Sequence, residues 1–226
     1  MSEIDYQVIF SGRRTISICI SPEKGVIVRA PYRASIRTIG QLVQKKSGWI
    51  KKHIDHYSKF KRLNKDKKYT DGENFLFMGK ENILRIGYSP ESYVNHYDNT
   101  IEVGTSIKDI SKVRILLERW YSQKAREVFP VRMEEILKKY RDYYFSPSKL
   151  AVKTLKSRWG SCTSKGNITL SSELIKLDEI YIEYVIIHEL CHLKYHNHGK
   201  EFYKLLGELI PDYKAIRKEL RKYITG

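Results

Sequence analysis

Apolar and polar residues alternate along the first thirty positions as they do in half-buried β-strands. Two such runs, residues 15–20 and 26–30, flank the turn-forming segment Ser21-Pro22-Glu23-Lys24-Gly25, which predicts a β-hairpin. From Ser35, a favoured N-cap type, the apolar spacing becomes helical, and Ser47-Gly48 interrupts this helix before it resumes. The opening segment therefore combines strands with a broken helix.

A basic connector, residues 59–68, leads to a second predicted hairpin over residues 74–86, which turns near Gly79-Lys80. Another strand is expected at residues 101–103. We therefore expect a strand-rich α+β N-terminal module over residues 1–104.

Residues 105–226 are expected to form a second domain that begins with a long helix. Its apolar residues recur every three or four positions, and Pro130 is expected to kink or split it before it resumes towards Tyr140. Strands are predicted over residues 150–155 and 167–171, around a loop at 157–166. The fold class expected for the whole chain is α+β.

The richest chemistry lies in the segment His188-Glu189-Leu190-Cys191-His192, which is followed by His198. A helix capped by Asp178 would place His188 and His192 one turn apart on the same face, so that both reach one metal ion. Cys191 falls on the apolar stripe of that helix, where an unpaired cysteine usually packs as a small hydrophobe. Three further residues share the stripe: Ile180, Tyr184 and Ile187.

The third ligand cannot lie on the same straight helix, because His198 would be about 9 Å further along its axis. The chain must therefore break after His192, and Asn197 and Gly199 tolerate the left-handed backbone that such a break favours. His196 is the competing ligand, and His198 is favoured over it because histidines at i, i+4 and i+8 on a straight helix would span about 12 Å, too far for one zinc ion.

Three histidines beside a glutamate predict a catalytic Zn²⁺ site, with Glu189 as the general base towards water activated by the metal. The group that stabilises the oxyanion stays open between Arg158, Tyr195, His196 and Tyr203. Cys162 lies in the expected loop at residues 157–166, and packing is favoured for it over a redox role.

Composition indicates a soluble globular protein, with 41% hydrophobic and 30% charged residues and no apolar run long enough to span a membrane. Three widely spaced cysteines argue against a disulfide framework, and residues 1–6 do not resemble a secretory signal. We expect a cytoplasmic protein.

The net charge of +16 is concentrated at the start of the chain, because residues 1–70 hold 16 Lys and Arg against 5 Asp and Glu. Such asymmetry favours an anionic partner, DNA or RNA before a membrane. A solvated basic surface would explain the same charge. No motif that reads bases accompanies the charge to favour a nucleic-acid partner over this alternative. Partner binding and plain solvation are both open.

Motifs in the last third resemble the YgjP-like family of predicted bacterial zinc metallopeptidases, which is related to the SprT-like and WLM peptidases. The motifs that carry the resemblance are Lys156-Ser157-Arg158-Trp159-Gly160-Ser161-Cys162, Gly166-Asn167-Ile168, His188-Glu189-Leu190-Cys191-His192-Leu193, Asn197-His198-Gly199 and Pro211-Asp212-Tyr213-Lys214. Position 199 departs from many relatives, in which serine is expected.

The resemblance implies a zincin-like catalytic domain in which His188, His192 and His198 bind zinc and Glu189 is catalytic. It further implies a protein or peptide substrate, and the SprT-like and WLM relatives suggest proteins associated with nucleic acid by analogy. The alternative is a nucleic-acid-binding protein with a structural zinc site. Structural sites rarely use three histidines with an adjacent glutamate, which favours the enzyme.

Overall fold

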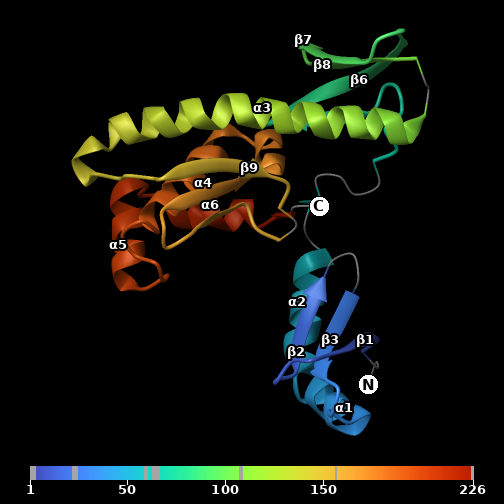
Figure 1. Ribbon diagram of the computed structural model, residues 1–226, viewed down its shortest axis with the longest axis vertical. Helices are drawn as coiled ribbons and strands as arrows, with labels where there is room; N and C mark the ends of the chain where they lie inside the picture. Colours follow the sequence, from blue (N-terminus) through green and yellow to red (C-terminus); the bar gives the residue numbers. More distant parts are fainter. Residues whose placement is uncertain are drawn as a thin grey trace. The chain divides into compact units, whose positions relative to one another are not determined.

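The computed structural model describes residues 4–21, 25–58, 61–62, 67–106, 109–155 and 157–224 (Figure 1). The strands are β1 (Tyr6–Ser11), β2 (Ser17–Ser21), β3 (Gly25–Pro31), β4 (Lys61–Arg62), β5 (Asn74–Phe77), β6 (Lys80–Tyr88), β7 (Tyr93–Tyr97), β8 (Thr100–Thr105), β9 (Lys149–Lys153), β10 (Gly160–Cys162), β11 (Asn167–Ser171) and β12 (Tyr223–Ile224). The α-helices are α1 (Ile36–Lys45), α2 (Ser47–Ser58), α3 (Ile110–Lys139), α4 (Glu179–Cys191), α5 (Lys200–Leu209) and α6 (Tyr213–Leu220), and the 3₁₀ helices are η1 (Arg141–Tyr143) and η2 (Ser172–Lys176). The fold is thus mixed α+β, as expected.

The chain divides into two compact units, residues 1–60 and 61–226. In the first unit β2 and β3 form the expected antiparallel hairpin, and β1 adds to β3 in parallel. Turn residues 22–24 lie outside the described residues. Ser35 caps α1 as predicted, because its Oγ accepts the Thr38 N–H at 3.1 Å. Ile39 and Val43 of α1 are buried against β3 in a small separate core.

The second unit contains a four-stranded sheet in the order β5-β6-β8-β7. The predicted hairpin of β5 and β6 is confirmed, and its turn residues Met78 and Gly79 have φ values of 50° and 77°. Two positive φ values in a two-residue loop are typical of a type I′ turn. Asp98 and Asn99 make a similar turn between β7 and β8. Strand β7 was not predicted from the sequence.

The turn at Met78 and Gly79 packs directly on the segment that leads into α4. Their backbone N–H groups donate to the carbonyl oxygens of Ile175 and Lys176, at 2.9 and 3.1 Å. The space around Gly79 is closed, since a Cβ there would lie 2.9 Å from Asp178 Cα. The β5–β8 sheet therefore shares one hydrophobic core with α3, α4 and α5. This sharing explains why the compact unit begins near residue 61, whereas the sequence pattern predicts a boundary at residue 104.

Helix α3 is one continuous element through Pro130, so of the two expected outcomes the split is wrong, and a kink stays a prediction. Proline removes one backbone hydrogen bond from a helix interior and crowds the preceding turn. The helix nevertheless continues, because the buried side chains of Phe129, Met133 and Ile136 hold both sides of the proline against the core. Packing on the core thus outweighs the local cost of the proline.

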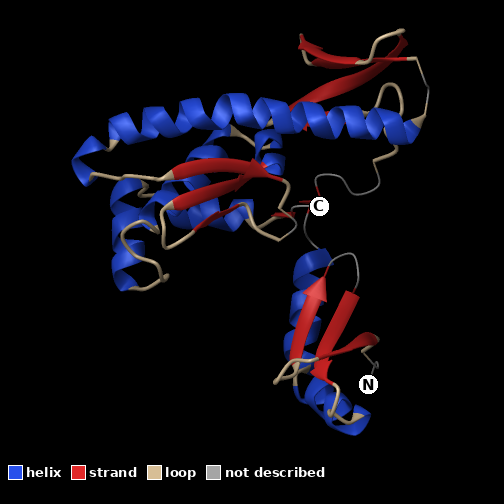
Figure 2. Ribbon diagram, in the orientation of Figure 1, coloured by secondary structure: helices blue, strands red, loops and turns tan. Residues whose placement is uncertain are grey.

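A three-stranded sheet in the order β10-β11-β9 lies beside α4 (Figure 2). Strands β9 and β11 correspond to the two predicted strands, whereas β10 occupies part of the expected loop. Helix α4 is buried on most sides, which corrects the predicted single stripe, and Ile180 of that stripe is 47% exposed. The sheet and the helix form the walls around the candidate site.

Two short strands, β4 and β12, pair in parallel and place residues 61–62 of the basic connector beside residues 223–224. The connector residues 59–60 and 63–66 lie outside the described residues. Within the part of the chain that is described, no helix combines the length and the apolar character needed to cross a bilayer.

Candidate metal centre

The end of α4 carries the first two histidines. Asp178 caps the helix as predicted, since its side chain accepts the Ile180 N–H at 3.0 Å. The helix runs to Cys191, so that His188 lies in its last turn and His192 is its C-cap, still with helical dihedrals. Both imidazoles consequently project from the same side of the helix end.

A tight turn then brings the third histidine back. The Gly199 N–H donates to the Asn197 carbonyl at 2.8 Å, a γ-turn pairing centred on His198. The predicted break after His192 is confirmed, but neither Asn197 nor Gly199 has a positive φ. The turn therefore forms without left-handed backbone at Asn197 or Gly199. A new helix, α5, begins at Lys200, as expected.

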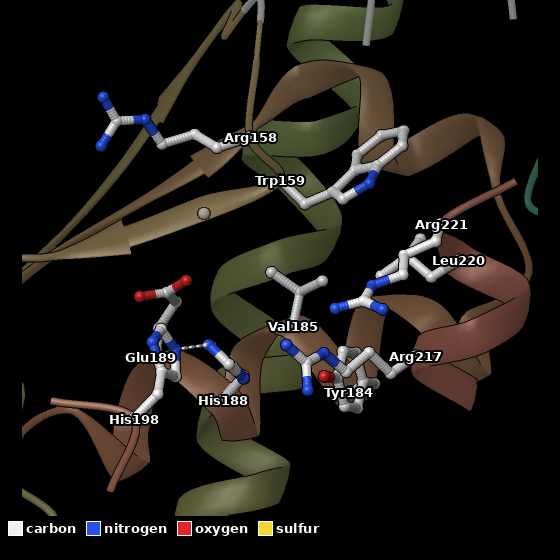
Figure 3. Close-up of a pocket in the computed structure, with 11 residues that line it drawn as sticks. Arg158, Trp159, Tyr184, Val185, His188, Glu189, His198, Arg217, Leu220 and Arg221 are labelled. Atoms are coloured by element: carbon white, nitrogen blue, oxygen red, sulfur yellow. Dashed lines mark hydrogen bonds between the residues drawn. The ribbon is translucent and has the colours of Figure 1, made fainter. Parts of the chain in front are cut away.

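The Nε2 atoms of the three histidines converge. His198 Nε2 lies 3.0 Å from His188 Nε2 and 3.2 Å from His192 Nε2, and the first of these contacts is drawn in Figure 3. Two Zn–N bonds of about 2.0–2.1 Å at a tetrahedral angle would place their nitrogens roughly 3.3 Å apart. Among the described residues, these three histidines form a group that could hold a metal ion.

The opposite nitrogen of His192 supports this orientation. His192 Nδ1 lies 3.0 Å from the backbone carbonyl oxygen of Tyr195, which can only accept. In the neutral imidazole the proton is therefore on Nδ1, which leaves the Nε2 lone pair directed to the centre of the group. Such hydrogen bonds are typical of histidines that bind metals.

Phe202 of α5 packs against all three imidazoles. Its ring centroid lies 4.9 Å from that of His188, 4.6 Å from His192 and 4.8 Å from His198, and the side chain is fully buried. A rigid ring in contact with each imidazole limits the rotations available to them. The helical spacing of α5 could have identified Phe202 as a buried residue, but not as a neighbour of the histidines.

The competing candidates lie outside the group. His196 is exposed and does not join the cluster. Cys191 is fully buried, as predicted, and burial raises the pKa of its thiol to about 12. Cys162 is half-buried in β10, and its thiol donates to the Thr163 carbonyl oxygen at 3.4 Å.

Glu189 lies inside the wall of the site and is only 5% exposed. Its Oε2 atom is buried without a hydrogen-bond partner among the described residues. Burial raises the pKa of Glu189 to about 7, and the positive charge of Arg158 opposes this rise. A carboxyl group with a pKa near neutrality is suited to accept and release a proton.

Gly160 of β10 provides the space for this carboxylate. A Cβ at position 160 would lie 2.7 Å from Glu189 Oε1 and 2.9 Å from its Cγ. Gly160 stands within one of the motifs that resemble the family, but its sequence context indicates no role for it. Only the pairing of β10 with β11, opposite α4, reveals its contact with Glu189.

A cavity of about 270 Å³ adjoins the histidines and Glu189. Its wall includes three arginines, Arg158, Arg217 and Arg221, of which only Arg158 was a candidate from the sequence (Figure 3). The other oxyanion candidates lie close by in different ways. The Tyr203 ring stacks on His198 at 6.1 Å, whereas Tyr195 contributes its backbone carbonyl to His192.

Comparison with known proteins gives partial matches to individual proteins. A UTP pyrophosphatase of Escherichia coli (strain K12) is 29% identical over 66 residues, which cover 29% of this chain and 40% of that protein. The crystal structure of the metallopeptidase zymogen of Pyrococcus abyssi abylysin is similar at a TM-score of 0.36, with 29% identity over 39% of this chain and 90% of that chain. The crystal structure of the metallopeptidase zymogen of Methanocaldococcus jannaschii jannalysin is also similar at a TM-score of 0.36. Its sequence is 23% identical, and the match covers 41% of this chain and 92% of that chain.

A family comparison covers far more of the sequence. The family model described as "YgjP-like, metallopeptidase domain" matches residues 14–223, which include most of both units and every residue of the candidate site. The resemblance noted in the sequence motifs is thereby confirmed. The chain belongs to the YgjP-like metallopeptidase family.

Proposed function

We propose that this protein is a zinc-dependent metallopeptidase in which His188, His192 and His198 bind the metal and Glu189 acts as general base. The observation that carries the proposal is the convergence of three Nε2 atoms beside a buried carboxylate at the edge of a cavity. Family membership supports the peptidase class. A structural zinc site is closed by four protein ligands, whereas this group has three histidines and adjoins a carboxylate and a cavity, as a catalytic site does.

Zinc held by these histidines would supply a Lewis acid and make water at the site more acidic. Glu189 would accept the proton of the attacking water, a role supported by its position next to His188 on α4 and on the wall of the same cavity. It would then pass that proton to the leaving amine, so that the carboxylate is restored. Phe202 and the Tyr195 carbonyl keep the imidazoles oriented.

The test uses turnover of a quenched-fluorescent peptide library together with zinc content. Glu189→Gln should retain zinc and lose at least about a hundredfold in turnover, the lower end expected for removing a general base. Glu183→Gln, the same change on the same helix outside the cavity, should turn over peptides normally. Undiminished cleavage by Glu189→Gln would exclude the proposed base.

A second candidate is hydrolysis of a nucleoside triphosphate, the kind of substrate in the name of the Escherichia coli relative. The arginines on the cavity wall favour it, since guanidinium groups suit phosphate oxygens. UTP assayed beside the peptide library, with release of pyrophosphate as the readout, separates the two activities. Rapid pyrophosphate release without peptide cleavage would replace the peptidase proposal.

Recruitment by nucleic acid remains a separate proposal, supported by the charge of the first unit. Residues 1–60 hold 11 Lys and Arg against 4 Asp and Glu. Contacts with phosphates would make binding fall steeply as salt rises. Fluorescence anisotropy of labelled DNA and RNA at increasing salt concentration tests this binding. An affinity that is absent or insensitive to salt would contradict recruitment by nucleic acid.

A further inference from the structure

The cavity beside the histidines has two chemically different ends. His188, His198 and Glu189 lie at one end, and two arginines, Arg217 of α6 and Arg221 at its C-cap, lie at the other (Figure 3). Arg158 also lines the wall, but its side chain extends away from these two arginines (Figure 3). The positively charged end is therefore formed by Arg217 and Arg221.

Arg217 is held in place by aromatic rings that connect it to the histidines. Its guanidinium group lies 5.5 Å from the centroid of the Tyr203 ring. That ring stacks on Tyr213 at 5.9 Å and on His198 at 6.1 Å. A guanidinium group that rests on an aromatic face loses little further freedom when it binds an anion.

The two guanidinium groups have no acidic partner within the described residues. No aspartate or glutamate oxygen of those residues lies within 4.0 Å of either group, and Glu219 of the same helix pairs with Lys222 instead. Residues 217 and 221 are also one helical turn apart, where like charges repel. Arg217 is half-buried and Arg221 is exposed, so both guanidinium groups can be reached by an anion from solution.

The surface beneath these arginines is apolar. Val185 and Leu220 line the same cavity, and both are buried. Apolar walls reduce the screening of charge by water, so an anion bound here would interact more strongly than at an open surface. Among the described residues that line the cavity, Glu189 is the one acidic residue, and it belongs to the opposite end.

We propose that Arg217 and Arg221 form a subsite that binds a carboxylate of the peptide substrate and so positions the scissile bond at the metal centre. This specificity rests on the proposed peptidase function. The carboxylate comes either from an Asp or Glu side chain near the scissile bond or from the C-terminus of the peptide. Both present two oxygens in the planar geometry that a guanidinium fork recognises.

The test compares peptides that differ by one charge. One pair carries Glu or Gln at the same internal position in a C-terminally amidated peptide, and a second pair differs only in a free or amidated C-terminus. Each peptide is measured for cleavage by the zinc-loaded full chain. Binding is measured separately by fluorescence anisotropy with the Glu189→Gln variant, which keeps the arginines.

We expect the charged member of at least one pair to be preferred about tenfold, both in kcat/KM and in affinity. Arg217→Gln and Arg221→Gln should each bring the ratio of the charged to the uncharged peptide, in kcat/KM and in affinity, close to one. Arg217→Lys should retain part of this preference, because the charge remains but the planar fork is lost. Lys218→Gln, the same loss of charge on the exposed side of α6, should leave the ratio unchanged.

The outcomes separate this inference from the function on which it rests. Cleavage of peptides without any preference for a carboxylate would overturn the subsite and leave the peptidase intact. A carboxylate preference that survives both Arg→Gln changes would also overturn it. A preference in binding to Glu189→Gln, lost in the added Arg→Gln changes, would support the subsite even if the wild-type protein cleaved none of the peptides.

Discussion

Glu189 occupies space that a side chain at position 160 would fill, because a Cβ built on Gly160 lies 2.7 Å from the Glu189 Oε1 atom. The strand β10 therefore approaches α4 as closely as its backbone allows. The carboxylate is confined between this strand and the histidines. The proposed base is thus positioned by a residue that carries no functional group of its own.

Replacing Gly160 by alanine should displace the carboxylate and reduce turnover by about tenfold or more, because a shift of the order of 1 Å at a reacting group is costly. Overpacking should also lower stability by about 1–3 kcal/mol. Zinc content should be unchanged. Gly87→Ala, at a strand position with nothing within 4 Å of the added Cβ, is the matched control. Full activity in Gly160→Ala would show that this contact does not position Glu189.

Phe202 should act on the metal through the histidines that it contacts. Phe202→Leu keeps most of the apolar volume but removes the flat ring shared by the three imidazoles, so zinc affinity should fall by about 10–100-fold, as it does when groups that orient metal ligands are changed. Competition with a chelator measures this. Phe129→Leu, in an equally buried residue of α3, should destabilise the fold similarly without changing zinc affinity. Equal zinc affinities in the two variants would contradict the positioning role.

The stability of the metal-free protein should fall in acid. Burial, followed by the charges of His192 and His198, lowers the pKa of His188 to about 3 from its usual 6.5. Between these values the unfolded chain binds the proton and the folded chain does not, so stability is greatest above pH 6.5 and declines as pH falls towards 3. Urea unfolding at a series of pH values should show a smaller decline for His188→Gln. The control His196→Gln should behave like the wild type, and identical slopes in all three proteins would contradict the assignment.

Residues 61–226 should unfold as one unit. Phe75 of β5 is buried in the core that also contains α4 and α5, so Phe75→Ala should destabilise the metal site along with the sheet, by about 3–5 kcal/mol. In a Trp49→Phe background, which removes the tryptophan of the first unit, denaturant unfolding followed by the fluorescence of Trp120 and Trp159 and by zinc release should give coincident transitions. Loss of the β5–β8 sheet at lower denaturant than zinc release would instead support a domain boundary near residue 104.

The local sequence was sufficient to predict features determined by neighbouring residues. The caps at Ser35 and Asp178, the hairpin of β5 and β6, and the break after His192 all follow from signals a few residues long. The grouping of His188, His192 and His198 was also accessible, since the reach of one metal ion limits where a third histidine can lie.

Features that depend on distant segments were not accessible. Gly160, Phe202 and Arg217 matter through contacts with other elements, and no local spacing reveals them. The unbroken α3 shows the same limit, because the core contacts of Phe129 override the signal of Pro130. The turn at Gly79 docks on Asp178, which joins two segments that the pattern alone had separated.

The central claim is that three histidines of this chain hold one zinc ion. The most direct test is the zinc content of the purified full chain by elemental mass spectrometry, with His198→Ala and His196→Ala in parallel. We predict about one zinc per chain for the wild type and for His196→Ala, and little or none for His198→Ala, because catalytic zinc sites usually need three protein ligands. Full zinc content in His198→Ala, or a wild type that cannot be loaded with zinc, would contradict the account.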